Sequence, residues 1–218
     1  IAIPGKRAVL SRFFKTGEGE YGAGDRFIGV TVAQQRELVK RYQVMPPSDI
    51  AILLSDEFHE CRLIALLFLV RHYQKSETDE EKIKILTIAK EHSCGLPVMA
   101  GVGTNSLEHT IANIRLLEPH GVDYFLVVVP YYNKPPQEGI YQYYKAVAAA
   151  TAKPVVLYNV PGRTGVNMTA ETTLRLAEID NIVAVKEASG KRDQILEILE
   201  KRPEGFAVLS GNDDETFD

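Results

Sequence analysis

Residues 154–159, PVVLYN, and residues 182–187, IVAVKE, share one pattern, a short apolar run that ends in a pair of polar residues. Similar runs recur roughly every 25–30 residues, the length of one strand plus one helix. Their apolarity is continuous rather than alternating, which indicates strands covered on both faces, as in a parallel sheet wrapped by helices. The predicted strands are 96–100, 124–129, 154–157, 182–185 and 206–209.

The alternation of strands and helices predicts an α/β fold, a partial (β/α)8 barrel of about five units. In such barrels the functional side chains come from the C-terminal ends of the strands. Each predicted strand here ends in glycine, proline or polar residues. These ends are the segments 103–105, 130–133, 158–161, 186–187 and 210–213.

Lys186 is the residue most indicative of chemistry. It ends the run 181–185, where barrel geometry directs a side chain to the mouth. Partial desolvation there lowers the pKa of a lysine and makes a neutral amine available to attack a ketone. The alternative is a surface lysine paired with Glu187, and the strand pattern leaves both interpretations open.

Tyrosine and arginine side chains follow the neighbouring strand ends. Tyr158 could move protons during dehydration of a carbinolamine, and Arg163 could bind a carboxylate in bidentate fashion. Tyr158 could equally be a half-buried strand end, and Arg163 a solvated loop residue. Tyr131 and Tyr132, judged alone, are more typical of a core or rim than of catalysis.

Four motifs occur in an order that resembles dihydrodipicolinate synthase, within the superfamily of pyruvate-dependent aldolases. A fifth segment, GVGTNS at 101–106, fits the end of the third strand of that family. The four motifs are PYYNKPPQEG at 130–139, LYNVPGRTG at 157–165, VKEASG at 185–190 and LSGNDD at 209–214. The resemblance implies condensation of pyruvate with aspartate semialdehyde, on the route to diaminopimelate and lysine.

The resemblance also implies roles for single residues. Lys186 would form the imine with pyruvate, and Tyr158 would relay protons. Tyr132 would complete the relay from across a subunit contact, which implies a homo-oligomer. Arg163 would hold the carboxylate of the semialdehyde or order the mouth, and Gly211 would contribute main-chain contacts. Neither a cofactor nor a metal is implied.

Two features depart from the family pattern. The first two strands, with the Thr-Thr-Gly-Glu turn whose threonine links the two tyrosines, have no counterpart, and neither has the eighth strand. Asn105 and Tyr131 match positions of the lysine feedback site, whereas His109 stands where sensitive relatives often have glutamate. Feedback control is therefore left open.

From residue 31 to residue 73 the sequence predicts helices only. Thr31 and Gln34 can form a capping box that opens a helix through residue 42, and Pro46-Pro47 breaks the chain. Ser48 is expected to cap a short helix, 49–54. The run 59–73 is apolar on nearly every side, which predicts a helix buried among others. The glycine-rich segment 17–24 is interpreted as a loop and not as a phosphate cradle.

Segments 6–42 and 58–73 resemble the start of HEAT-like DNA alkylation repair proteins. The chain contains no tryptophan, so the Trp-Asp segment that faces the lesion in that family is absent. Lys40, Arg41, Arg62 and Arg71 could contact phosphates, but a solvated helical face explains them better. Residues 1–75 carry a net charge of +3 and residues 76–218 one of -7, and +3 is too small to indicate nucleic-acid binding.

The chain is therefore interpreted as a chimera of a helical domain, 1–78, and a partial barrel, 79–218, joined by charged, linker-like residues at 75–82. The start lacks the features of a signal peptide, and free buried thiols are favoured over a disulfide for Cys61 and Cys94. Both indicate a cytoplasmic protein without membrane contact. The leading function is an aldolase-type lyase. The alternatives are a DNA-binding helical module with an inert passenger, and a misjoined chain with neither activity.

Overall fold

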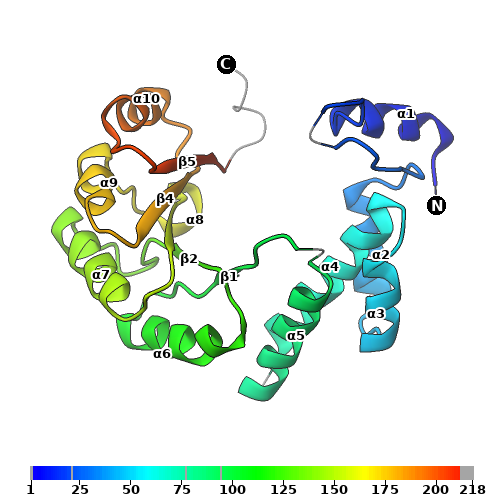
Figure 1. Ribbon diagram of the computed structural model, residues 1–218, viewed down its shortest axis with the longest axis horizontal. Helices are drawn as coiled ribbons and strands as arrows, with labels where there is room; N and C mark the ends of the chain where they lie inside the picture. The colour runs from blue at the N-terminus through cyan, green and yellow to red at the C-terminus, as the bar shows by residue number, and fades with distance from the viewer. Residues whose placement is uncertain (1, 21, 77, 94, 212–218) are drawn as a thin grey trace. The chain divides into compact units, whose positions relative to one another are not determined.

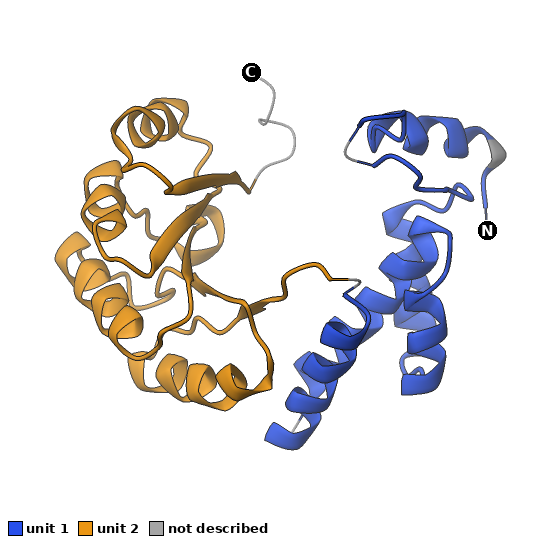
Figure 2. Cartoon of the chain, in the orientation of Figure 1, with its two compact units in different colours: residues 1–94 blue, residues 95–218 orange. Residues whose placement is uncertain are grey.

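The predicted strands form one parallel sheet in the computed structural model, which describes residues 2–20, 22–76, 78–93 and 95–211. The chain divides into two compact units, Ile1–Cys94 and Gly95–Asp218 (Figure 2). The sequence placed the boundary at 78/79 instead. None of the described helices has the length and apolarity that crossing a membrane requires.

The sheet of the second unit has the strand order β1-β2-β3-β4-β5, with every neighbouring pair parallel. This order confirms the predicted barrel segment, in which each strand lies beside the next along the chain. The strands are β1 (Met99–Gly101), β2 (Tyr124–Val128), β3 (Val155–Asn159), β4 (Ile182–Glu187) and β5 (Ala207–Ser210).

Helices follow the strands and lie along the outer side of the curved sheet (Figure 1). Several begin where a hydroxyl accepts a bond from a free backbone N–H: Ser106 caps α6, and Thr169 caps α9. The helices of this unit are α6 (Leu107–Leu117), the 3-10 turn η1 (Glu118–His120), α7 (Gln137–Ala149), α8 (Pro161–Thr164), α9 (Ala170–Ala177) and α10 (Arg192–Lys201).

The core of the second unit lies between the sheet and these helices. In β2, Phe125 and Val127 are fully buried, while Leu126 and Val128, on the other face, are only half-buried. The expectation that both faces of every strand are covered is therefore wrong for β2. The inner face of the sheet is the one that strands across a closed barrel would cover.

The first unit is helical, as predicted, and begins with a helix that the sequence did not predict, α1 (Pro4–Phe13). The capping box of Thr31 and Gln34 is confirmed. Ser48 is not a cap, because the following helix already starts at Pro47, a residue suited to a first helical turn. The remaining helices are α2 (Val32–Tyr42), α3 (Pro47–Leu54), α4 (His59–Lys75) and α5 (Asp79–Glu91).

Helix α4 is the centre of this unit, but it is not covered on all sides. Phe68 and Leu69 are buried, whereas Leu66 is 46% and Val70 53% exposed. The prediction of burial on nearly every side is therefore wrong. The core around α4 contains Val39, Ile50, Leu54, Ala65, Phe68 and Leu69, and Ile85 and Ile88 of α5 pack against it.

Residues 79–82, which the sequence placed in a linker-like segment, belong to helix α5. The Thr78 hydroxyl accepts a bond from the backbone N–H of Glu81, and the Glu81 carboxylate accepts one from the backbone N–H of Thr78. This capping box opens α5 three residues after α4 ends. Because α5 packs on the core around α4, the boundary between the units comes after this helix.

A buried carboxylate fixes the loop that enters α2. Glu60 is 1% exposed, and it accepts hydrogen bonds from the backbone N–H groups of Ile28 (3.1 Å), Gly29 (2.8 Å) and Val30 (3.2 Å). A carboxylate is stable in such a site when several donors face it. The described residues of the glycine-rich segment, 17–20 and 22–24, form turns and bends, as expected of a loop.

Candidate active site

Lys186 and Tyr158 lie next to each other at the C-terminal ends of β4 and β3. They are register partners in the parallel ladder, and the Nζ of Lys186 lies 4.8 Å from the centre of the Tyr158 ring. Both side chains are half-buried. The structure thus brings together an amine and a phenol on one face of the sheet, as the sequence predicted for the barrel mouth.

The alternative partner of Lys186 points elsewhere. Glu187 is 3% exposed, and its carboxylate accepts hydrogen bonds from Asn159, Gln194 and the backbone of Ser189. Successive side chains of a strand point to opposite faces, so Glu187 faces the helices while Lys186 faces the interior of the barrel segment. A surface pair of these two residues is therefore not what the structure shows.

Gly211 lies beside the end of β4. Its backbone N–H donates to the Glu187 carbonyl at 2.7 Å, and a Cβ at this position would lie 2.5 Å from the Cβ of Ala188. Since real Cβ atoms do not come so close to a carbon, only glycine lets the main chain approach here. This steric constraint is enough to explain why position 211 is a glycine. It also places the main chain of Gly211 next to β4, the strand that carries Lys186.

Tyr132 and Arg163 are at the rim of the strand ends and are exposed. Tyr132 is 86% exposed and has a φ of 69°, in the left-handed region. That conformation costs a tyrosine about 1–3 kcal/mol, and such strain is common at functional sites. Arg163 lies in the short helix α8 that follows β3.

The two candidate regulatory residues belong to loops that are tied together. Asn105 follows β1, Tyr131 follows β2, and the amide of Asn133 donates to the Asn105 carbonyl at 3.0 Å. Tyr131 is 39% exposed and Asn105 half-buried.

A buried hydroxyl network that sequence reasoning missed supports the loop after β1. The Tyr143 hydroxyl donates to the Thr104 carbonyl (2.9 Å) and lies 2.8 Å from the Thr110 hydroxyl. Burial raises the pKa of Tyr143. The buried face of α7 also contains Tyr144 and apolar residues, and in a sequence it looks like ordinary core. The signal available was the pair of threonines, Thr104 and Thr110, on either side of the start of α6.

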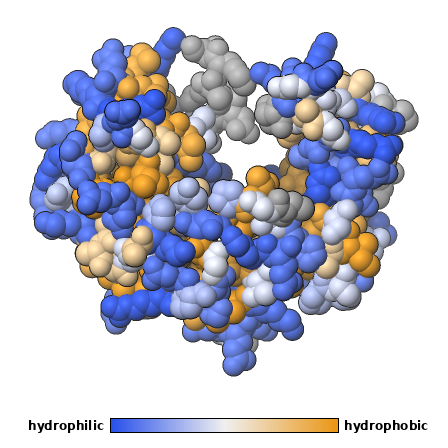
Figure 3. All heavy atoms as spheres, in the orientation of Figure 1, coloured by the Kyte–Doolittle hydropathy of each residue, from blue (hydrophilic) through white to orange (hydrophobic). Residues whose placement is uncertain are grey.

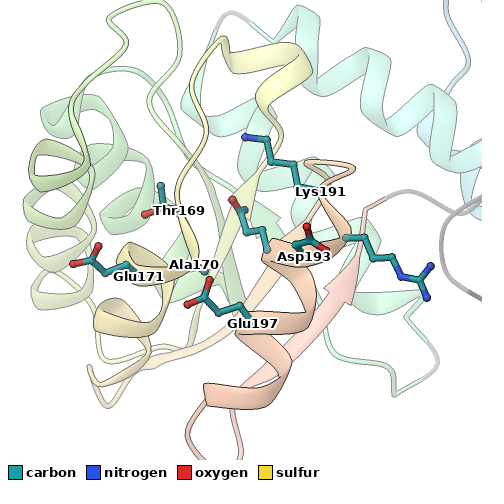
Figure 4. A pocket seen from close by; sticks show the side chains of 8 residues that line it. Thr169, Ala170, Glu171, Lys191, Asp193 and Glu197 are labelled. Atoms are coloured by element: carbon teal, nitrogen blue, oxygen red, sulfur yellow. The ribbon is translucent and has the colours of Figure 1, made fainter.

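A surface pocket of the second unit is lined by other residues, some of which are labelled in Figure 4. It has a volume of about 680 Å³, lies between the starts of α9 and α10, and contains none of the predicted site residues. In the part of the chain that the structure describes, no group of three or more His, Cys, Asp or Glu side chains is placed to hold a metal ion.

The four basic residues that were considered for phosphate contacts have partners within the chain. Arg62 pairs with Asp25, Lys40 pairs with Glu37, and the Nε of Arg71 donates to the Gln43 carbonyl. Arg41 lies over the ring of Tyr42. Cys61 is a free, half-buried thiol whose pKa burial raises, and Cys94 lies outside the described residues.

Comparison with known proteins agrees with this geometry. Residues 74–218, two thirds of the chain, match the model of the dihydrodipicolinate synthetase family. The chain belongs to this family. Residues 1–92 match the model of the DNA alkylation repair enzymes, so both predicted resemblances are confirmed. The two matches overlap at residues 74–92, which contain α5.

Individual relatives give the extent of the likeness. The 4-hydroxy-tetrahydrodipicolinate synthase of Parabacteroides distasonis is 54% identical over 142 residues, which are 64% of this chain and 48% of the relative. The Cyanidioschyzon merolae enzyme, solved with lysine bound, aligns at a TM-score of 0.60 with 43% identity, over 64% of this chain and 48% of that one.

The Acinetobacter baumannii enzyme, solved with pyruvate, aligns at a TM-score of 0.64 with 32% identity, over 78% of this chain and 59% of that one. The chain spans about half the length of the curated relatives that it matches.

Proposed function

We propose that the chain acts as a class I aldolase-type lyase, in which Lys186 forms an imine with pyruvate that condenses with aspartate semialdehyde. The observation that supports this most is the contact of the Lys186 amine with the Tyr158 ring at the mouth of a barrel segment. Imine formation by a lysine is expected at this edge of the sheet, where the C-terminal ends of the strands meet. The amine and the phenol are residue types suited to it, and the family is one in which it is expected.

The proposed steps balance around one amine. The neutral Lys186 amine attacks the ketone carbon of pyruvate, and a proton moves from the nitrogen to the ketone oxygen to give a neutral carbinolamine. A proton from Tyr158 then lets that oxygen leave as water, which gives the protonated imine and a Tyr158 phenolate. The phenolate takes a proton from the methyl carbon to form an enamine. The enamine carbon attacks the aldehyde carbon of the second substrate, the protonated imine forms again, and Tyr158 gives its proton to the aldehyde oxygen.

Three further residues support the two substrates in this proposal. Arg163 would bind the carboxylate of the semialdehyde as a bidentate partner. The main chain at Gly211 would contact the pyruvate carboxylate side of the site. Tyr132, which is exposed and strained, would complete the proton relay in the site of a second copy, so we propose a homo-oligomer.

We also propose Asn105 and Tyr131 as contacts for lysine in a regulatory site. The bond through Asn133 that ties their loops supports this assignment, as does the lysine bound to the Cyanidioschyzon merolae enzyme. A cytoplasmic location is proposed as well, because Cys61 is a free thiol.

Reductive trapping tests the imine. The chain is incubated with pyruvate and borohydride, and its intact mass is measured. We expect one pyruvate adduct per chain, mapped to Lys186 and lost in Lys186→Arg. Lys191→Ala is the matched control, since Lys191 is an exposed lysine five residues away, and it should label fully. A label on another lysine, or none on folded protein, would contradict the assignment.

For the first unit we propose a structural role rather than DNA binding. Lys40, Arg62 and Arg71 have partners within the chain, which supports the interpretation of these cations as a helical surface. This unit matches the family model of the alkylation repair enzymes. Excision of alkylated bases is not proposed for it, because the chain contains no tryptophan.

A further inference from the structure

We propose that Glu187 is a positioning residue for Lys186: its buried carboxylate joins the ends of β3, β4 and α10, and so keeps the Lys186 amine over the Tyr158 ring. The inference rests on the proposed function, because Lys186 must form the imine for its position to affect catalysis. It concerns a side chain on the opposite face of the sheet, which touches neither substrate nor amine.

Four hydrogen bonds converge on this carboxylate, which is 3% exposed. Its Oε1 accepts from the Asn159 amide at 3.1 Å and from the backbone N–H of Ser189 at 2.8 Å. Its Oε2 accepts from the Asn159 amide at 3.1 Å and from the Gln194 amide at 3.3 Å. One side chain thus links β3, the loop after β4 and the first turns of α10.

Asn159 is itself held in one orientation. Its Oδ1 accepts from the backbone N–H of Met168 at 3.0 Å, and its Nδ2 donates to the Met168 carbonyl at 3.2 Å. Rotation of the amide would break both bonds, so Nδ2 remains directed at Glu187. Asn159 and Glu187 are register partners, one residue beyond the pair Tyr158 and Lys186. A shift in the register of Asn159 and Glu187 therefore also displaces Tyr158 relative to Lys186.

The main chain extends the same junction. The Ala188 N–H donates to the Asn159 carbonyl at 2.9 Å, and the Gly211 N–H donates to the Glu187 carbonyl at 2.7 Å. The strand ends of β3, β4 and β5 therefore meet at Glu187.

The junction requires a side chain that only accepts hydrogen bonds. Each group that faces the carboxylate is a donor, namely the amides of Asn159 and Gln194 and the backbone N–H of Ser189. A glutamine of the same shape would place its own N–H groups against one of these donors. A buried donor without an acceptor is costly, so the strand ends are expected to separate and carry the amine away from the phenol.

The test is the rate of pyruvate trapping per folded molecule. In Glu187→Gln we expect the limiting rate to fall about tenfold, because small misplacements of reacting groups have effects of this size or larger. The pyruvate concentration at half-maximal rate should change little. Glu187→Asp, which keeps an acceptor-only group, should retain more of the rate than Glu187→Gln. Glu171→Gln, at an exposed glutamate of α9, is the matched control and should trap at the wild-type rate.

A purely structural role has a different signature. Loss of stability alone would reduce the fraction of chains that label without changing the rate of those that remain folded. Asn159→Ala should lower the rate similarly, and the double variant should lose little more than either single one, because both act through one junction. A wild-type rate in folded Glu187→Gln, or additive losses, would overturn the inference.

A second measurement does not depend on the imine. The ε-methylene protons of Lys186, assigned with Lys186→Arg, should show the upfield NMR shift of protons near an aromatic ring. This shift should shrink in Glu187→Gln and persist in Glu171→Gln. If the wild-type chain forms no pyruvate adduct, the proposed function fails, and an unchanged shift in Glu187→Gln would separately overturn the positioning role.

Discussion

At the scale of single residues, strand alternation decides which neighbours can act together. The strand pattern left two interpretations of Lys186 open, a side chain at the barrel mouth and a surface lysine paired with its neighbour Glu187. In β4 the two residues point to opposite faces, so Glu187 binds Asn159 and Gln194 while Lys186 lies over Tyr158. The alternation of side chains along the strand could be predicted from the sequence. The residues that contact each face of the strand could not.

The buried tyrosines of α7 make stability depend on alkaline pH. Burial raises the pKa of Tyr143, and that of Tyr144 even more. Both raised values mean that the folded state holds its protons to higher pH than the unfolded chain. Their contribution is therefore complete below about pH 10 and is lost as the pH rises through the folded pKa. We expect the free energy of unfolding from urea titrations to fall above about pH 10.

Tyr143→Phe should be less stable at neutral pH, because it leaves the Thr104 carbonyl without its donor, and its stability should decline less steeply in alkali. An identical alkaline slope in wild type and variant would exclude this origin.

At the scale of elements, a local cap decides to which unit α5 belongs. The charged residues 75–82 looked like a linker, and the sequence boundary was placed at 78/79. The capping box of Thr78 and Glu81 instead starts a helix, and Ile85 and Ile88 attach it to the core of the first unit. Residues 74–92 also match both families, so sequence likeness alone does not assign this helix.

Removing the cap tests that assignment. Thr78→Ala deletes the acceptor of the Glu81 N–H and should lower the stability of the first unit by about 1 kcal/mol. Native-state hydrogen exchange should show faster exchange in α4 and α5, with β2 to β4 unchanged. Thr87→Ala, an exposed hydroxyl within the same helix, is the control and should have little effect. Faster hydrogen exchange in the strands β2 to β4 would contradict this assignment and would indicate that α5 packs on the second unit.

At the scale of the whole molecule, the chain joins a helical unit to a barrel segment with open edges. Met99 on β1 and Leu209 on β5 are each 41% exposed, and hydrophobic atoms reach the surface of both units (Figure 3). Exposed strand edges of this kind pair readily with other chains. The Thr-Thr-Gly-Glu turn, whose threonine links the two tyrosines in the aldolases that this chain resembles, also has no counterpart in this sequence.

We therefore expect the 218-residue chain by itself to turn over poorly and to self-associate. Loss of a general acid–base relay lowers rates by about 10²–10⁴, and an open sheet is prone to aggregation. A coupled assay with pyruvate and aspartate semialdehyde, combined with analytical ultracentrifugation, measures both. Turnover of roughly 1–10³ s⁻¹ from monodisperse, full-mass monomer would contradict this expectation.

The sequence by itself determined the parallel strands, the helical first unit, both families and the residues at the strand ends. These properties depend on short-range patterns, namely apolar runs, caps and motifs, which a chain displays before it folds. Only the tertiary structure decided that α5 packs on α4, that one face of β2 stays half-covered, and that Glu187 turns away from Lys186. Each of these depends on which distant segments come into contact, and burial and hydrogen-bond partners arise only from those contacts.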